Sequence, residues 1–290
     1  VQWIADKSWC YRKSFTIDKV DFAKFKCADL VFEGIDTYAS VYLNDSLIYQ
    51  SDNMFVPHKI AIKKWLKIGK NELRVIFPPL LTMLKSKAKQ LSYTLPENER
   101  VFARKAQFHF GWDWAPRILS LGLFKPVYLN FWNTIKVNQP VVITSLNNGS
   151  GKVACKIPVL SASRQPMDLI VKVMDEHSNV IYSQQKFSLL KDSVFELKFI
   201  IKNPKVWNPL GSGESNVYHV KISVSTVKGE KFEFHKQVGF RTVSLVQTPD
   251  SIGSSFYFKV NGQPVFAKGA NWTPMEFLPH QNTPEKYRKL

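Results

Sequence analysis

Residues Arg104–Arg117 read R-K-A-Q-F-H-F-G-W-D-W-A-P-R. Treated as a strand, the stretch would place its two phenylalanines and two tryptophans on one face, with His109 and Asp113 on the other. Gly111 and Pro116 indicate a strand that breaks into a loop. The residues alone are therefore compatible with a core strand beside a turn.

The same stretch also has the composition of a sugar-binding loop. Asp113 lies between Trp112 and Trp114. Indole rings stack on the apolar C–H faces of sugars, and a carboxylate accepts hydrogen bonds from their hydroxyls. Aromatic runs are also common in protein cores, so both interpretations stay open at this point.

Several other motifs accompany this stretch in a fixed order. They are W-C-Y-R-K-S-F, F-E-G-I-D-T-Y-A-S-V-Y-L-N, D-N-M-F, V-G-F-R-T-V and F-Y-F-K-V-N-G-Q-P-V-F-A-K-G-A-N-W-T-P, at residues 9–15, 32–44, 52–55, 238–243 and 256–274. Together with F-H-F-G-W-D-W they resemble the β-mannosidases, in the glycoside hydrolase clan that also holds β-galactosidases and β-glucuronidases. The resemblance covers nearly the whole chain, most weakly between about residues 140 and 235.

Periodicity predicts a mainly β protein. Thr37–Leu43 alternates, Asn44-Asp45 is a turn signal, and the only good helix of the first region is expected over Leu80–Leu91. Many short strands with almost no helix argue for β-sandwiches. The resemblance implies a galactose-binding-like jelly roll over residues 1–133 and an immunoglobulin-like sandwich over 134–245.

Residues 246–290 have a different character. Asn261-Gly262 predicts a hairpin, and Thr283-Pro284-Glu285 predicts the start of a helix. The resemblance implies that this is the first unit of a (β/α)8 barrel, in a chain truncated at both ends. One unit cannot close a barrel, so we expect this tail to be disordered or poorly packed.

Composition excludes some classes of function. Of 290 residues, 44% are hydrophobic, and no apolar run approaches the roughly 20 residues of a membrane span. The net charge of +17 raises nucleic acid as a partner, but the lysines are spread over many predicted strands without a recognition motif. We therefore predict neither a nucleic-acid nor a membrane partner. The cysteines have no zinc-ligand spacing and are expected to be packed hydrophobes: Cys10, Cys27 and Cys155.

No catalytic residue is assigned to this chain. Retaining glycosidases use two carboxylates about 5–5.5 Å apart, and the resemblance implies that both are glutamates beyond Leu290. The sequence has no G-x-S-x-G, H-E-x-x-H or phosphate-loop motif, and the histidines are expected to be structural or surface residues. No metal or cofactor is predicted.

The resemblance implies a role in substrate binding for the W-D-W loop, in the subsite for the terminal mannose. Trp112 would form a wall, Asp113 would accept hydrogen bonds from sugar hydroxyls, and Trp114 would lie behind them. Ala115 stands where the family mostly has glycine, and Glu276 where it usually has aspartate. Asn271 and Trp272 are expected either to line the barrel mouth or to belong to a plain first strand.

The predicted function is the non-catalytic N-terminal portion of a retaining β-mannosidase that hydrolyses terminal non-reducing β-D-mannose, inactive by itself. The expected partner is a β-mannoside oligosaccharide or a glycoprotein glycan. One alternative is a stand-alone lectin-like carbohydrate-binding module. Another is the same portion of an exo-β-glucosaminidase or endo-β-mannosidase. A lysosomal or secreted location is implied for an animal source.

Overall fold

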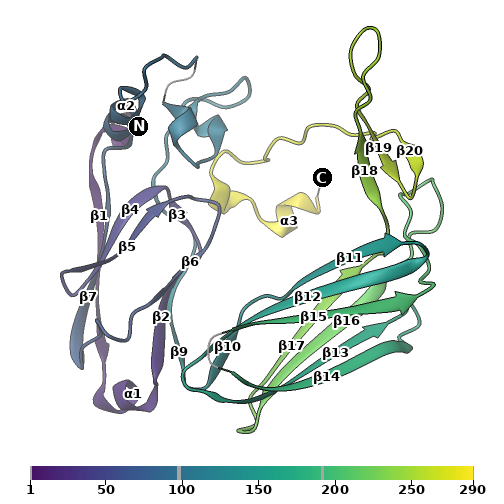
Figure 1. Ribbon diagram of the computed structural model, residues 1–290. Helices are drawn as coiled ribbons and strands as arrows, with labels where there is room; N and C mark the ends of the chain where they lie inside the picture. The colour runs from purple at the N-terminus through teal and green to yellow at the C-terminus, as the bar shows by residue number, and fades with distance from the viewer. Residues whose placement is uncertain (1, 97–98, 191–192, 290) are drawn as a thin grey trace. The chain divides into compact units, whose positions relative to one another are not determined.

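The computed structural model describes residues 2–96, 99–190 and 193–289 (Figure 1). The chain forms two compact units. The first joins the residues up to Asn133 with those from Trp272 onward, and the second is Thr134–Asn271. The predicted tail is thus shared between the units, with residues 246–271 in the second. The three-part domain division itself stays a prediction.

The first unit is built from antiparallel strands in two main sheets. One has the order β1-β7-β4-β5, the other β6-β2-β9, and a short pair joins β3 to β8. The bounds are β1 Trp9–Ile17, β2 Cys27–Phe32, β3 Ile35–Asp36, β4 Tyr38–Leu43, β5 Ser46–Asp52, β6 His58–Ala61, β7 Gly69–Phe77, β8 Gly122–Leu123 and β9 Val127–Trp132.

Alternation in β4 places one face of the strand in the core. Ala39, Val41 and Leu43 are buried, while the residues between them are partly exposed. Asn44 and Asp45 have φ values of 49° and 67°, as a type I′ turn requires, and they connect β4 to β5. The strand and the hairpin predicted from this segment are confirmed.

Asn44 has a second function in this turn. Its Nδ2 donates to the carbonyl of Trp65 and to Asn71 Oδ1, both at 2.8 Å, and its Oδ1 accepts from the amide of Glu72 at 3.0 Å. Asn44-Asp-Ser matches the glycosylation motif, but the side-chain nitrogen that a glycan would modify is already hydrogen-bonded within the fold.

Two helices differ from the sequence prediction. α2 spans Leu80–Ala88 and buries Leu80, Leu81 and Leu84, but it ends before the predicted Leu91. α1, Lys19–Lys24, was not predicted, because six residues are too few for a helical period to show. Its start is fixed by Asp18, whose side chain accepts from the amide of Asp21 at 2.6 Å.

Short 3-10 turns complete the unit: η1 Gln2–Asp6, η2 Arg100–Phe102, η3 Gln107–Phe110 and η4 Pro279–Gln281.

The strand interpretation of Arg104–Arg117 is wrong. Gln107–Phe110 is the 3-10 turn η3, and Trp112–Ala115 is a tight turn. His109 is fully buried while Phe108 is only partly so, the reverse of what an alternating strand would give. The reason is that His109 makes buried hydrogen bonds that no strand pairing would supply.

The second unit is a two-layer antiparallel sandwich, as predicted. One sheet has the order β10-β12-β11 with β15 paired to β12, and the other β14-β13-β16-β17. The bounds are β10 Ile135–Val137, β11 Val141–Asn147, β12 Ser150–Ser161, β13 Gln165–Met174, β14 Val180–Leu190, β15 Ser193–Lys202, β16 Tyr218–Thr226 and β17 Lys231–Val238.

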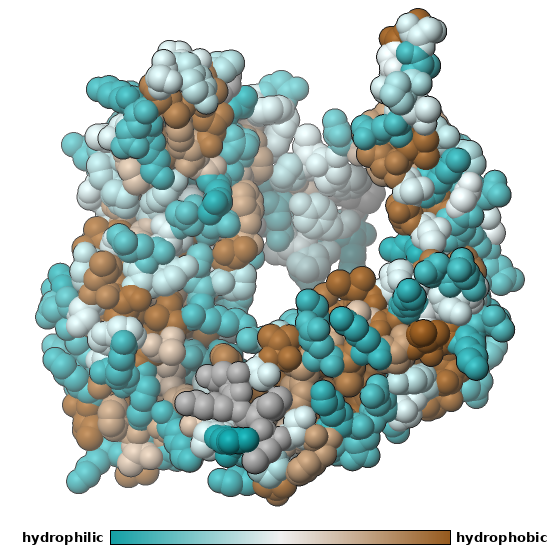
Figure 2. All heavy atoms as spheres, viewed as in Figure 1, coloured by the Kyte–Doolittle hydropathy of each residue, from teal (hydrophilic) through white to brown (hydrophobic). Residues whose placement is uncertain are grey.

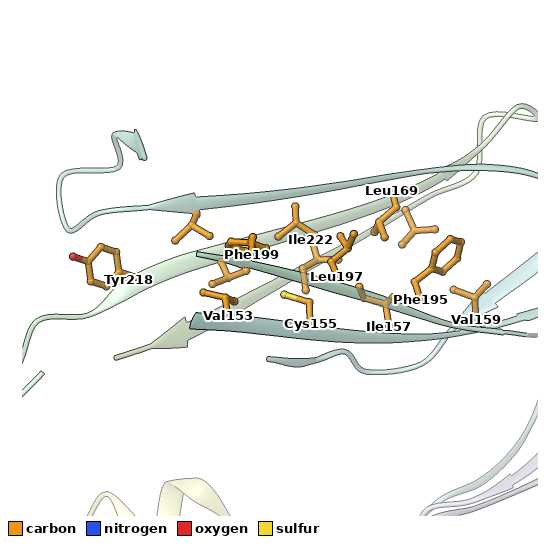
Figure 3. Packing of buried hydrophobic residues seen from close by; sticks show 14 of the residues in the cluster. Val153, Cys155, Ile157, Val159, Leu169, Phe195, Leu197, Phe199, Tyr218 and Ile222 are labelled. Carbon is orange, nitrogen blue, oxygen red and sulfur yellow. The ribbon is translucent and has the colours of Figure 1, made fainter. Parts of the chain in front are cut away.

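Facing side chains of the two sheets fill the core of this sandwich (Figure 3). Cys155, Ile157, Leu169 and Ile222 are fully buried. Each large aliphatic side chain removed from water contributes roughly 1.5–3 kcal/mol. Burial raises the pKa of the Cys155 thiol to about 11, so this cysteine is a packed hydrophobe as predicted. The same prediction is wrong for Cys10, which is exposed. Hydrophilic and hydrophobic residues are interspersed on the face of the molecule shown in Figure 2.

A small sheet extends the second unit: β18 Val243–Val246, β19 Tyr257–Val260 and β20 Gln263–Val265. Asn261 and Gly262 form the predicted hairpin turn, with φ values of 52° and 80°. Asn261 Nδ2 donates to the carbonyl of Trp207 and to Asn208 Oδ1, both at 2.9 Å, which attaches the turn to the sandwich. The predicted terminal helix is α3, Pro284–Tyr287, capped by Thr283.

Tertiary packing of the tail is sparse. Between residues 246 and 289, none of the side chains whose exposure the structure describes, which leaves out residue 279, is buried. This agrees with the expectation of poor packing for one barrel unit, and the described residues contain no barrel. Among them, too, no helix has the length and apolar character to cross a bilayer.

Candidate functional site: an exposed W-D-W turn and a buried ion pair

The W-D-W segment forms a two-residue turn. The amide of Trp112 donates to the carbonyl of Ala115 at 3.0 Å, and the amide of Ala115 donates back at 3.2 Å. Asp113 and Trp114 are the two residues between them. The strand parity that would have sent Trp112 and Asp113 to opposite faces therefore does not apply.

Two small residues shape the turn. Gly111 has φ 103°, a backbone conformation that favours glycine, and it separates η3 from the turn. Ala115 is buried, and its amide and carbonyl close the turn at a position where the resemblance implied glycine. The substitution at Ala115 thus does not prevent the tight turn.

All three predicted sugar-binding residues lie at the surface. Trp112 is 53% exposed, Trp114 is 37% exposed, and Asp113 is exposed between them. The Arg100 guanidinium carbon lies 5.2 Å from the Trp112 ring centroid, and the Phe108 ring lies 5.1 Å from that of Trp114. These contacts order both indoles and leave apolar ring surface available for stacking.

A buried ion pair lies in the same part of the first unit. Lys105 Nζ donates to both oxygens of Asp36 and, at 2.7 and 2.9 Å, to the carbonyl and Oγ of Ser120. The side chains of Lys105 and Asp36 are 0% and 4% exposed. Burial lowers the pKa of Lys105, and the Asp36 carboxylate opposes that shift. Thr37 Oγ1 also donates to Asp36, at 2.5 Å.

His109 extends this network to the C-terminal tail. Its Nδ1 lies 3.2 Å from Ser120 Oγ, and its Nε2 lies 3.2 Å from the carbonyl oxygen of Phe277. The ring is fully buried. Burial, and then the nearby Lys105 ammonium, lower the pKa of His109 to about 4. His109 is a structural residue, as predicted for the histidines.

Acidification should destabilise the first unit. The pKa of His109 is about 4 in the folded chain and about 6.5 in the unfolded chain. As the pH falls, the unfolded chain therefore binds the proton before the folded chain does. The free energy of unfolding should therefore be unaffected by His109 above pH 6.5 and should fall between pH 6.5 and 4, by at most about 1.4 kcal/mol per pH unit.

Urea unfolding at about pH 7, 5.5 and 4.5 measures this slope. His109→Asn should flatten it, whereas His235→Asn, at an exposed position of the second unit, should leave it unchanged. An identical slope in wild type and His109→Asn would show that His109 does not titrate in this range.

The tail residues have contacts of their own. Lys286 Nζ lies 2.8 Å from Glu276 Oε1, and Asn282 bonds the backbone amide and carbonyl of Glu276. Glu276 therefore links its segment to α3. Asn271 and Trp272 are exposed, and a role at a barrel mouth stays a prediction.

Sequence reasoning did not identify the Lys105–Asp36 network. The two residues are separated by 69 positions, and neither lies in a recognised catalytic pattern. A lysine inside an aromatic, apolar stretch was the one available signal, because lysine is almost never fully buried unless paired. Among the described residues, no group of three or more His, Cys, Asp or Glu side chains is arranged to hold a metal ion.

Comparison with known proteins agrees with this architecture. Residues 1–125 match the model described as "Glycosyl hydrolase 2 galactose-binding domain-like", and residues 135–241 match "Glycosyl hydrolases family 2". The chain belongs to glycosyl hydrolase family 2. The two matched regions fall in the two sandwiches described above.

The proteins to which this chain is similar include fungal and bacterial β-mannosidases. "Beta-mannosidase B" of Aspergillus flavus and that of Aspergillus oryzae are each 31% identical over 99% of this chain. The β-D-mannosidase structure from Dictyoglomus thermophilum is 36% identical over 99% of this chain, with a TM-score of 0.84. The chain spans 34% of the length of the fungal relatives and 36% of the bacterial structure.

Proposed function

We propose that this family 2 chain is the non-catalytic N-terminal part of a retaining β-mannosidase that acts on terminal non-reducing β-mannosyl residues. The observation that supports it best is the W-D-W turn, two exposed indoles flanking a carboxylate, in a chain similar to β-mannosidases along 99% of its length. The substrate is a β-mannoside oligosaccharide or a glycoprotein glycan.

The turn supplies one side of a mannose subsite in this proposal. Trp112 forms a wall, Asp113 accepts hydrogen bonds from sugar hydroxyls, and Trp114 lies behind them. Because all three side chains are exposed, a further surface must cover them to exclude water from the sugar. That surface, and the two catalytic carboxylates, would come from the barrel of a polypeptide about three times as long.

Hydrolysis of an aryl β-mannoside tests the proposal. The 290-residue chain alone should release no aryl alcohol above background, whereas the longer polypeptide that includes a barrel should do so with retention at the anomeric carbon. Turnover by the 290-residue chain, or a longer polypeptide that is inactive on mannosides but active on glucosaminides, would contradict it.

A carbohydrate-binding module is the second candidate, and the exposed turn favours it. Such a module would bind mannosides with the same affinity whether or not further polypeptide is attached. Isothermal titration of the 290-residue chain and the longer protein distinguishes the two. A lysosomal or secreted location remains a proposal for an animal source, and the Aspergillus relatives are fungal.

A further inference from the structure

One buried histidine contacts the C-terminal segment from directly beside the W-D-W turn. We propose that His109 is a positioning residue whose neutral ring, with its proton on Nε2, fixes the segment around Phe277 relative to that turn. The two atoms that define the link are His109 Nε2 and the Phe277 carbonyl oxygen, 3.2 Å apart. The consequence for sugar binding rests on the function proposed above.

The partners determine which nitrogen carries the proton. A carbonyl oxygen only accepts, so Nε2 must be the donor toward Phe277. In a neutral ring Nδ1 then carries no proton; it lies 3.2 Å from Ser120 Oγ, whose hydroxyl donates to Asp36 Oδ2 at 2.6 Å. A second proton would place a cation in a fully buried site beside the Lys105 ammonium. Burial and the Lys105 ammonium therefore outweigh the nearby Asp36 carboxylate and keep His109 a neutral donor.

Contacts between aromatic rings connect the same two segments as this hydrogen bond does. The Phe277 ring centroid lies 4.9 Å from that of His109 and 5.8 Å from that of Phe108. Phe108 in turn lies 5.1 Å from Trp114. A continuous series of rings thus joins Phe277 to the W-D-W turn; the Phe108–Phe277 pair is edge-to-face, and the other two pairs are tilted.

The contact between His109 and Phe277 connects two segments that each carry tryptophan and a carboxylate. Glu276 directly precedes Phe277, and Trp272 lies five residues earlier with its indole 69% exposed. A movement of Phe277 would displace an indole and a carboxylate relative to Trp114 and Asp113. His109 therefore acts through Phe277 and does not itself contact the sugar.

Two amide substitutions separate the two nitrogens of His109. His109→Asn keeps a polar group near the Nδ1 position but cannot donate to Phe277, whereas His109→Gln places an amide donor near the Nε2 position. Phe277→Leu tests the ring contacts and leaves the backbone carbonyl in place.

Hydrogen exchange of the 290-residue chain, followed by mass spectrometry of peptides, gives the first readout. In His109→Asn, exchange of residues 272–282 should be about tenfold faster, and in His109→Gln within about twofold of wild type. Exchange in β16 and β17 of the second unit should not change. Equal exchange at 272–282 in wild type and His109→Asn overturns the proposal. Equally fast exchange of the whole first unit in the Asn and Gln variants also overturns it, because the histidine would then only support the core.

The longer mannosidase gives the second readout. His109→Asn should raise KM for an aryl β-mannoside about tenfold with a smaller change in kcat, and His109→Gln should restore it. If exchange of residues 272–282 is faster in His109→Asn but KM is unchanged, the proposed effect on the sugar subsite is wrong. The proposal that His109 positions the segment around Phe277 would then still hold. If the longer protein hydrolyses no mannoside, the proposed function fails, and the exchange result still decides the link.

Discussion

Lys105→Met should lower the free energy of unfolding of the first unit by about 3–5 kcal/mol. The ammonium is 0% exposed and donates to Asp36 and to both oxygens of Ser120. Removing it leaves the Asp36 carboxylate, 4% exposed, without a counter-charge in a site that water does not reach. Urea unfolding of the 290-residue chain at neutral pH measures the loss.

The adjacent residue provides a matched control. Arg104 pairs with Asp52 at 3.2 Å, but the two side chains are 68% and 62% exposed, so Arg104→Met should cost less than about 1 kcal/mol. The double variant Lys105→Met/Asp36→Leu should recover part of the stability, because no charge remains buried. A loss for Lys105→Met no larger than that for Arg104→Met would contradict this account of the buried pair.

Asp113→Asn in the longer mannosidase should weaken mannoside binding or kcat/KM about ten- to a hundredfold. A hydrogen bond from a buried hydroxyl to a carboxylate contributes roughly 1.5–3 kcal/mol, and the amide that replaces it is a weaker, neutral acceptor. Steady-state kinetics on an aryl β-mannoside, with titration of a mannose-type inhibitor, separates the effect on rate from that on affinity.

Stability serves as the control for this variant. Asp113 is exposed in the free chain, so Asp113→Asn should change the free energy of unfolding by less than about 0.5 kcal/mol. Asp6→Asn, at another exposed carboxylate of the first unit, should change neither stability nor kinetics. Unchanged kcat/KM in Asp113→Asn would remove Asp113 from the subsite.

Local patterns predicted the regular parts of the fold. Alternation identified β4, and the dipeptides Asn44-Asp45 and Asn261-Gly262 identified both hairpin turns. The end of α2 was placed too late, because Leu91 continues the helical spacing without packing in the core. In each success the signal and the structure lie within a few residues of each other.

The same distinction holds for the candidate site: its local features could be predicted, and its contacts between distant residues could not. The sequence by itself determined the mainly β class and the residue types of the W-D-W turn, because periodicity, turn residues and composition act over short ranges. Its resemblance to a known family supplied the division into two sandwiches. Only the tertiary structure decided that Arg104–Arg117 is a 3-10 turn followed by a tight turn, and that Lys105 and His109 are buried. Their partners Asp36 and Phe277 lie 69 and 168 positions away, and a buried polar group takes its conformation from the hydrogen bonds that satisfy it.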